Sequence, residues 1–285
     1  MDTGKTAHLL LDFLFPERCV LCGNYITFRT RRGPYPVCAD CAAGFAREEG
    51  PRCRVCSMPL GSDRVICMEC RGRKRVFDAN FSLFLYADPK VARSVAAYKG
   101  DGIPAMAGFF CGFLADFLMA RQEPALLVPV PCRRESRAGR GFDQVLLLCR
   151  ILKRRYGFPY ARLLRRAGGS REQKTLNRVD REANLRGVIL PRMPAGFRVP
   201  ERVVLLDDVF TTGATANECA AVLKTMGVKN VFVLPIAIDC RRQAGHQRFY
   251  LIPFTRMNHV LQEGRVERST LFLYPRIFSY TGGAR

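Results

Sequence analysis

The stretch that decides the fold runs from Val203 to Thr215 and reads Val-Val-Leu-Leu-Asp-Asp-Val-Phe-Thr-Thr-Gly-Ala-Thr. Its first four residues are β-branched or leucine, which predicts a strand buried on both faces of a parallel sheet. Two aspartates mark the end of this strand. A turn rich in hydroxyl side chains then leads into a helical pattern from Asn217 to Met226. A strand, a polar loop and a helix N-terminus in this order form an anion site, because backbone N–H groups and the positive end of the helix dipole face the loop.

The loop and the two acids suit different parts of one ligand. The hydroxyls of Thr211, Thr212 and Thr215 add donors for a phosphate. Asp207 and Asp208 would repel a phosphate, but they suit sugar hydroxyls or the coordination shell of a metal. The stretch therefore predicts a site for a sugar phosphate such as ribose 5-phosphate. The alternative is a turn without a ligand, although an ordinary turn needs one capping residue rather than two acids and three threonines.

The same stretch resembles the Asp-Asp-x-x-Thr-Thr-Gly-x-Thr signature of the type I phosphoribosyltransferases, which bind phosphoribosyl pyrophosphate (PRPP) together with Mg²⁺. The resemblance implies that the two acids hold the ribose 2- and 3-hydroxyls and that the following backbone surrounds the 5-phosphate. A regulator that only senses PRPP would use the same loop. The implied PRPP-binding residues are Asp207, Asp208, Val209, Phe210, Thr211, Thr212, Gly213, Ala214 and Thr215.

The bulk composition is that of a folded protein with an unusual charge. The chain has 285 residues, of which 48% are hydrophobic and 25% charged, enough for one good core and a small satellite domain. Its 46 Lys and Arg against 25 Asp and Glu give a net charge of +21, which indicates anionic partners, either phosphorylated small molecules or nucleic acid. No apolar stretch reaches the roughly 18 residues of a membrane span. We therefore expect no transmembrane helix, and a cytoplasmic location.

Eight of the 13 cysteines form four Cys-x-x-Cys knuckles, which is the spacing of structural zinc sites. A zinc site is favoured over disulfides because a cytoplasmic compartment keeps thiols reduced. Four thiolates leave no open coordination position, so the sites are expected to be structural. Pairing between the sets is the alternative to pairing within them. The two expected Zn²⁺ sites are Cys19, Cys22, Cys38 and Cys41, and Cys53, Cys56, Cys67 and Cys70.

The remaining pattern predicts an α/β domain with a doubly wound parallel sheet. A basic loop leaves the carboxyl end of the strand at 126–130, where open α/β sheets bind ligands. The segment from Arg133 to Arg186 holds 16 Lys and Arg against 5 Asp and Glu, which fits a mobile basic hood or a solvated face equally well. The expected strands are 77–86, 126–130, 203–206 and 230–238, and the expected helices are 7–15, 91–99, 104–119, 144–156 and 217–226.

The whole arrangement resembles the ComF-type competence proteins, also described as double zinc ribbon phosphoribosyltransferases. The resemblance is carried by the two four-cysteine sets, by Val-Pro-Val-Pro at 128–131, by Arg-x-x-Arg-Gly-Phe-x-Gln at 137–144 and by the 207–215 loop. It implies a role around incoming single-stranded DNA during natural transformation, beside a helicase. The residues expected at the pyrophosphate and hood are Arg133, Arg137, Arg140 and Gln144.

These features divide the chain into three parts and leave two functions open. We expect a double zinc-ribbon module at 1–75, a type I phosphoribosyltransferase-like domain at 76–240 with its hood at about 133–187, and an extension without an assigned role at 241–285. The first function is a phosphoribosyltransferase, or PRPP sensor, with an unnamed acceptor and no residue that stands out as its base. The alternative is a non-catalytic zinc adaptor that binds single-stranded DNA and a helicase. A homo-oligomer is compatible with either.

Overall fold

A computed structural model of the chain describes residues 16–26, 35–45, 50–61, 64–121, 126–132, 138–139, 141–167, 188–194 and 196–240. All of them lie within one compact unit of the chain. The expected helix at 7–15, the extension at 241–285, and Arg133, Arg137 and Arg140 lie outside the described residues. No helix in the described part of the chain is both long and apolar enough to cross a bilayer.

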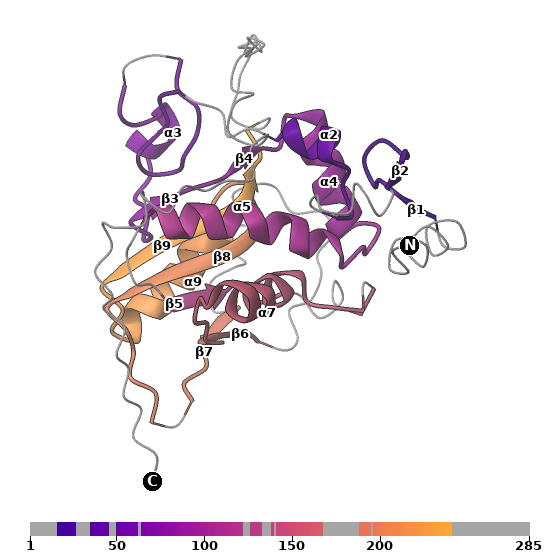
Figure 1. Ribbon diagram of the computed structural model, residues 1–285. Coiled ribbons are helices and arrows are strands. Elements are labelled where there is room, and N and C mark those ends of the chain that lie inside the picture. The colour runs from indigo at the N-terminus through magenta and orange to yellow at the C-terminus, as the bar shows by residue number, and fades with distance from the viewer. Residues whose placement is uncertain are drawn as a thin grey trace, which may run out of the picture. The chain divides into compact units, whose positions relative to one another are not determined.

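A parallel sheet forms the centre of the fold (Figure 1). Its order is β3-β9-β8-β5, and β4 also pairs with β9. The longest pairing joins β8 and β9, where Leu205 lies opposite Val233. Pairing of β5 with β8 places Val128 opposite Leu205. The strands span Ala79–Asn80 (β3), Phe84–Leu85 (β4), Leu126–Pro129 (β5), Arg202–Phe210 (β8) and Asn230–Ile238 (β9).

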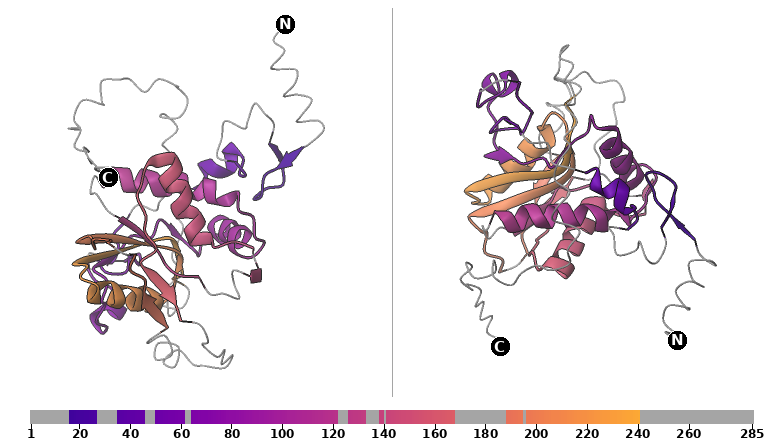
Figure 2. Two further views of the ribbon diagram at one scale, coloured as in Figure 1. Left: turned by 90° about the horizontal axis from the view of Figure 1, so that it is seen from below. Right: turned by 45° about the horizontal axis from the view of Figure 1, so that its top comes forward.

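Helices cover both faces of this sheet, because successive strand residues point to opposite sides. Leu206 and Leu234 belong to one core cluster, shared with α4 (Pro89–Lys99), α5 (Met106–Ala120) and α7 (Gln144–Tyr156). Leu205 and Val233 belong to the other, shared with α9 (Ala214–Thr225). Figure 2 shows α5 and α7 on one side of the strands and α9 on the other. The predicted fold class, an α/β doubly wound parallel sheet, is confirmed.

Two element boundaries differ from the sequence prediction around the central strands. The strand β8 does not close at the acids; it continues through them to Phe210, because β9 is long enough to pair with Val209 and Phe210. The helix α9 accordingly begins at Ala214, three residues before the predicted start.

The expected strand at 77–86 is two short strands, β3 and β4. The backbone between them still follows β9, since Phe81 N donates to Val233 O (2.8 Å) and Leu83 N to Pro235 O (3.4 Å). Pro235 has no N–H to donate in return, so the regular ladder is interrupted there. The helix predicted at 91–99 extends back to Pro89, and the one predicted at 104–119 spans 106–120.

The cysteine sets lie on short elements before the sheet. The first set flanks a two-stranded ribbon, β1 (Glu17–Arg18) with β2 (Tyr25–Ile26), and a one-turn helix, α2 (Ala39–Ala43). Cys70 of the second set lies on the short helix α3 (Met68–Arg71). A further antiparallel pair, β6 (Leu164–Arg166) with β7 (Ile189–Pro191), flanks residues 168–187, the part of the predicted hood at about 133–187 that follows β6 and lies outside the described residues.

Candidate phosphoribosyl site and zinc ribbons

The sequence-predicted loop opens onto a cavity of about 470 Å³. The cavity lies at the carboxyl ends of β5 and β8, the edge where open α/β sheets bind ligands. The side chains that line it come from the β8 loop, from the ends of β4, β5 and β9, from the helices α4 and α7, and from the strand β6. Those that bear on its chemistry are Asp207, Asp208, Thr211, Thr215, Lys99, Gln144, Arg166 and Asp239.

The two acids of β8 are held in different ways. Asp208 is buried, with an exposed fraction of 6%, and forms an ion pair with Lys99 Nζ at 2.9 Å. The same carboxylate accepts a hydrogen bond from Gln144 Nε2. Asp207 accepts a hydrogen bond from the backbone N–H of Asp208 at 2.9 Å. Burial, together with the neighbouring Asp208 carboxylate, raises the pKa of Asp207 from 3.8 to about 7. Asp207 is therefore a proton acceptor near neutral pH, and its ionisation depends on what enters the cavity.

The loop after β8 turns sharply at Gly213. This glycine precedes α9 with φ +77°, a backbone conformation that side chains with a Cβ rarely adopt. A Cβ there would lie 2.6 Å from Phe210 Cζ, so both the turn and the packing require glycine. Thr212 Oγ1 accepts a hydrogen bond from Ala214 N at 3.3 Å, while Thr211 and Thr215 line the cavity. Val209 also lines it, whereas Phe210 is buried against the sheet.

The start of α7 explains the positions of Asp143 and Gln144. The Asp143 carboxylate accepts a hydrogen bond from Leu146 N at 3.0 Å, so Asp143 caps the helix. Gln144, predicted at the pyrophosphate and hood, lines the cavity with an exposed fraction of 4% and donates to Asp208. Its backbone carbonyl accepts from the buried Tyr98 hydroxyl at 2.6 Å, which fixes the first turn of the helix.

The sequence did not assign Lys99 to the site. Lys99 is the last residue of α4 and precedes a glycine-rich turn, which is the one signal that could have marked it. Arg166, counted in the basic hood, approaches from β6 and donates from Nε to Pro131 O at 3.1 Å. Together they bring two cations to the cavity beside the acid pair. Tyr86 and Asp239, at the ends of β4 and β9, also line the cavity and have no counterpart in the sequence prediction.

The eight knuckle cysteines gather into two clusters, and each cluster is formed within one set. In both, all four sulfur atoms lie within 4.8 Å of one another. Cys22 and Cys38 sulfurs are 3.7 Å apart, and those of Cys56 and Cys67 are 3.6 Å apart. Tetrahedral zinc with Zn–S bonds of about 2.3 Å requires sulfurs about 3.8 Å apart. The residues therefore fit structural Zn²⁺, and Gly23 takes the left-handed backbone (φ +77°) expected after a knuckle.

The other five cysteines do not form such a cluster. Cys111, Cys149, Cys219 and Cys240 are buried among apolar side chains. Burial raises the pKa of the Cys111 thiol to about 12, which keeps it protonated. Cys132 is different because it lines the cavity.

Comparison with known proteins gives the zinc module a family description. A model of the double zinc ribbon domain matches residues 10–71. The competence protein ComFC of Streptococcus pneumoniae is 29% identical over 225 residues, which cover 75% of this chain and 96% of the relative. Over three quarters of its length the chain is thus similar to a competence protein of the ComF type.

Some of the other relatives are named for DNA utilization and not for competence. The DNA utilization protein YhgH of Salmonella typhi is 27% identical to this chain over 228 residues, which cover 76% of this chain and 95% of the relative. Competence protein F of Haemophilus influenzae is 31% identical over 115 residues, which cover 40% of this chain and 50% of the relative. The double zinc ribbon and the relationship to competence proteins confirm the resemblance found in the sequence.

Solved structures similar to this chain include hypoxanthine phosphoribosyltransferase from Trypanosoma cruzi. The match has a TM-score of 0.31 and 16% identity, and it covers 54% of this chain and 73% of that chain. Because the TM-score is low, the fold assignment rests on the sheet order and the two covered faces described above.

Proposed function

We propose that the cavity binds PRPP with Mg²⁺ and that the protein either transfers the phosphoribosyl group or senses PRPP. The observation that supports this most strongly is the lining of a single cavity by an acid pair, by hydroxyls of a strand-to-helix loop and by two cations. A ligand that carries ribose hydroxyls, a 5-phosphate and a pyrophosphate offers a partner to each of these groups.

In this proposal Asp207 and Asp208 accept hydrogen bonds from the ribose hydroxyls. The backbone N–H groups of 211–215, with the threonine hydroxyls, donate to the 5-phosphate at the start of α9. Lys99 and Arg166 neutralise charge on the pyrophosphate, together with the basic loop that contains Arg133, Arg137 and Arg140. Mg²⁺ would be held by carboxylate and phosphate oxygens, which are the ligands it prefers.

If transfer occurs, the chain supplies position and charge rather than a covalent partner. The bond from ribose C1 to the pyrophosphate oxygen breaks, the acceptor forms a bond to C1, and pyrophosphate leaves with the electron pair. Positive charge develops at the ribose, and cations hold the departing group. The described side chains lining the cavity include Asp239 and Tyr86 on the β4–β9 side, where an acceptor would contact the protein.

The deciding experiment is calorimetric titration of Mg²⁺·PRPP into zinc-replete protein, followed by an assay for released pyrophosphate. Asp207→Asn should abolish binding, because the amide donates where the carboxylate accepts. Glu201→Gln is the matched control: this exposed acid immediately precedes β8, at the opposite end from Asp207, and pairs with Lys229. Absence of binding at millimolar PRPP by folded protein would rule out the proposal. Equal loss in both variants would also contradict it.

A second candidate function is DNA binding, supported by the net charge of +21 and by relatives named for competence and DNA utilization. In this role the chain is a zinc adaptor for single-stranded DNA, and a helicase is the partner that the family resemblance implies. Fluorescence anisotropy with a labelled oligonucleotide should show affinity falling steeply between 50 and 200 mM salt, on the order of 10³-fold for several phosphate contacts. DNA binding that survives Asp207→Asn would separate this surface from the cavity. A salt-independent or undetectable affinity would exclude the adaptor role.

A further inference from the structure

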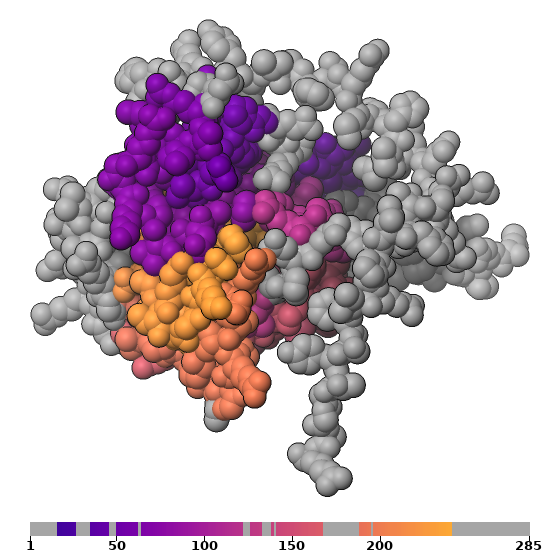
Figure 3. Space-filling view, turned by 90° about the vertical axis from the view of Figure 1, so that its left-hand side faces the viewer, coloured from indigo at the N-terminus to yellow at the C-terminus, as the bar shows by residue number. Residues whose placement is uncertain are grey.

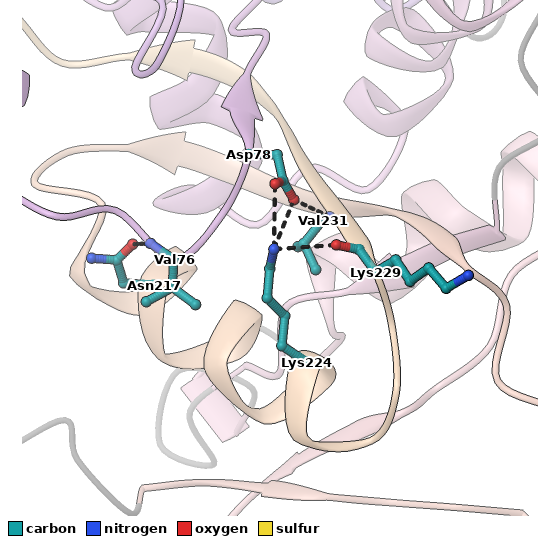
Figure 4. A network of polar contacts seen from close by, with 6 residues as sticks. All are labelled: Val76, Asp78, Asn217, Lys224, Lys229 and Val231. Atoms are coloured by element: carbon teal, nitrogen blue, oxygen red, sulfur yellow. Dashed lines mark hydrogen bonds and ion pairs between the residues drawn. The ribbon is translucent and has the colours of Figure 1, made fainter.

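Three consecutive residues that follow the second cysteine set contact the loop after β8. Arg75 donates from one guanidinium nitrogen to Thr212 O at 2.7 Å. The next residue, Val76, donates its backbone N–H to Asn217 Oδ1, in the first turns of α9, at 3.0 Å (Figure 4). These contacts join parts of the chain that are more than 130 residues apart in the sequence.

The third residue, Phe77, packs its ring against Phe210 in an edge-to-face arrangement, with centroids 5.8 Å apart. Both rings are buried. Phe210 is also the side chain that requires glycine at position 213. Phe77 therefore packs against the residue that precedes the loop, and neither ring lines the cavity.

The charge of Arg75 is not neutralised by any described side chain. Its Nε and second terminal nitrogen are buried and have no hydrogen-bond partner among the described residues. The guanidinium lies directly against the turn, since a Cβ on Gly213 would be 2.9 Å from it. Arg75 is not one of the side chains that line the cavity. A half-buried cation with no counter-charge among the described side chains, next to a loop of backbone donors, makes the loop more attractive to an anion.

The second cysteine set fixes the position of Arg75. The helix α3, which carries Cys70, ends at Arg71, and only three residues separate it from Arg75. On the other side, Asn80 donates its backbone N–H to Val55 O (2.9 Å) and its side-chain amide to Cys56 O (2.8 Å). The segment between them is thus held to the Cys53–Cys56 knuckle. In Figure 3 the purple residues of this module lie directly against the orange and yellow residues of the sheet and α9.

The same segment is also tied to the far end of α9. Asp78 accepts a hydrogen bond from Val231 N at 2.7 Å and pairs with Lys224 Nζ at 3.1 Å (Figure 4). Residues 75–78 therefore contact α9 and the strand beside it at several points, which leaves little freedom for Arg75 when the module is folded.

The first cysteine set has no comparable contact with the loop among the described residues. Its neighbour Phe45 packs against Phe84 and Phe109, in the core cluster on the opposite face of the sheet. The second set belongs to the cluster that contains α9 and Phe210. The two zinc modules are therefore not equivalent with respect to the phosphate loop.

We propose that the second cysteine module is part of the phosphate site and acts through Arg75. With its metal bound, the module holds the guanidinium against residues 212–213, fixes the loop backbone and adds positive charge behind it. Arg75 is a positioning residue, since it acts on the ligand through the loop. This inference rests on the proposed function, because it concerns the affinity of the same loop for a phosphate.

The first test compares Arg75→Gln with Lys74→Gln, which removes the same charge from the preceding, exposed residue. Ribose 5-phosphate is titrated into each zinc-replete variant. Arg75→Gln should weaken binding about tenfold, as expected when a charge-assisted contact is lost, whereas Lys74→Gln should change the affinity less than about twofold. Arg75→Lys should recover part of the loss, because it keeps the charge but not the planar fork. Equal affinities of the two glutamine variants would overturn the proposal.

The second test uses cysteines in matched positions. Cys67 and Cys38 each begin the second knuckle of their set, and the backbone N–H of each donates to the first sulfur of its set at 3.3 Å. Both Cys67→Ser and Cys38→Ser should lower the zinc content, measured by atomic emission. The loss of affinity for ribose 5-phosphate should be several-fold larger for Cys67→Ser. If that variant does not fold, Arg75→Gln still decides the question.

Hydrogen exchange separates this inference from the proposed function. Amides of 211–214 should exchange faster in Arg75→Gln than in Lys74→Gln, even without ligand. If the unmodified protein binds neither ribose 5-phosphate nor PRPP, the proposed function fails, and the exchange rates still report whether Arg75 positions the loop. Unchanged exchange and unchanged affinity in Arg75→Gln would reject the inference by itself.

Discussion

The acid pair places two similar side chains in different electrostatic positions. Asp208 is compensated by Lys99 at 2.9 Å and by Gln144, whereas Asp207 lies beside that charged group in a buried position. The result is a pKa of about 7 for Asp207, well above the 3.8 of an ordinary aspartate. A ligand that donates hydrogen bonds to the pair favours the ionised form, so ligand binding and proton release are linked.

We therefore expect the affinity for Mg²⁺·PRPP to fall when the pH is lowered from 8 to 6, because Asp207 gains a proton across this range. Calorimetry at constant ionic strength measures this dependence, and proton release on binding can be read from buffers of different ionisation enthalpy. An affinity that is flat over this range, with no proton release, would contradict the role given to Asp207.

The same group affects stability with the opposite sign. The folded protein holds the Asp207 proton more tightly than the unfolded chain does, so this contribution to stability is present below pH 4 and is lost as the pH rises through about 7. Asp207→Asn has no proton to lose. It should therefore raise the melting temperature relative to the unmodified protein more at pH 8 than at pH 5, which differential scanning fluorimetry measures.

A second prediction at the scale of a residue concerns Gly213. Gly213→Ala should destabilise the fold by more than the roughly 1–2 kcal/mol of a left-handed backbone, because its Cβ also meets Phe210 at 2.6 Å. Gly157→Ala is the matched control, since Gly157 has φ +79° and open space around the missing Cβ. Chemical denaturation gives both free energies of unfolding, and equal losses would show that the clash is relieved.

Two helices each contribute one end to the site, and a capping aspartate determines where each helix begins. The helix α4 begins after Asp88, which accepts from Lys90 N at 2.8 Å, and ends at the cavity with Lys99. The helix α7 begins at the cavity, after the Asp143 cap. Capping therefore determines where Lys99 and Gln144 lie relative to the acid pair.

Removing the cap of α7 tests this arrangement. Asp143→Ala should lower the free energy of unfolding by about 1 kcal/mol, and it should weaken ligand binding because Gln144 follows directly in the chain. Asp143→Asn keeps an acceptor at the cap and should be close to the unmodified protein in both measurements. If Asp143→Asn behaved like Asp143→Ala, the negative charge rather than the hydrogen bond would be the important feature.

For the whole molecule, the two cysteine clusters join separate core clusters on the two faces of one sheet. Metal in each cluster therefore stabilises a different part of the same fold. We expect two Zn²⁺ per chain. Chelation should expose about eight thiols to Ellman's reagent beyond those that react in the zinc-bound protein. A yield of one Zn²⁺, or no additional thiols after chelation, would contradict the two-site arrangement.

The sequence predicted most of the fold because its signals are local. The apolar runs that became β5, β8 and β9 are short and rich in leucine and β-branched residues, and the helices α4, α5 and α7 are marked by their apolar residues, so each could be recognised without knowing its partners. The knuckle spacing predicted the cysteine clusters for the same reason. Where the predicted boundaries were wrong, the neighbouring strand determined the actual ones. The strand β8 continues past its acids because β9 is long enough to pair with it, and Pro235 of β9 interrupts the regular pairing in the stretch between β3 and β4.

By itself, the sequence determined the acid pair, the glycine turn and the eight thiolates, since each depends on residues close together in the chain. Only the tertiary structure decided that Lys99 and Arg166 share a cavity with Asp208, that Asp207 holds its proton to about pH 7, and that Arg75 lies behind the loop. These properties depend on distance and burial in space. A pKa shift or an uncompensated charge is set by neighbours from other elements, and no local pattern records which neighbours those are.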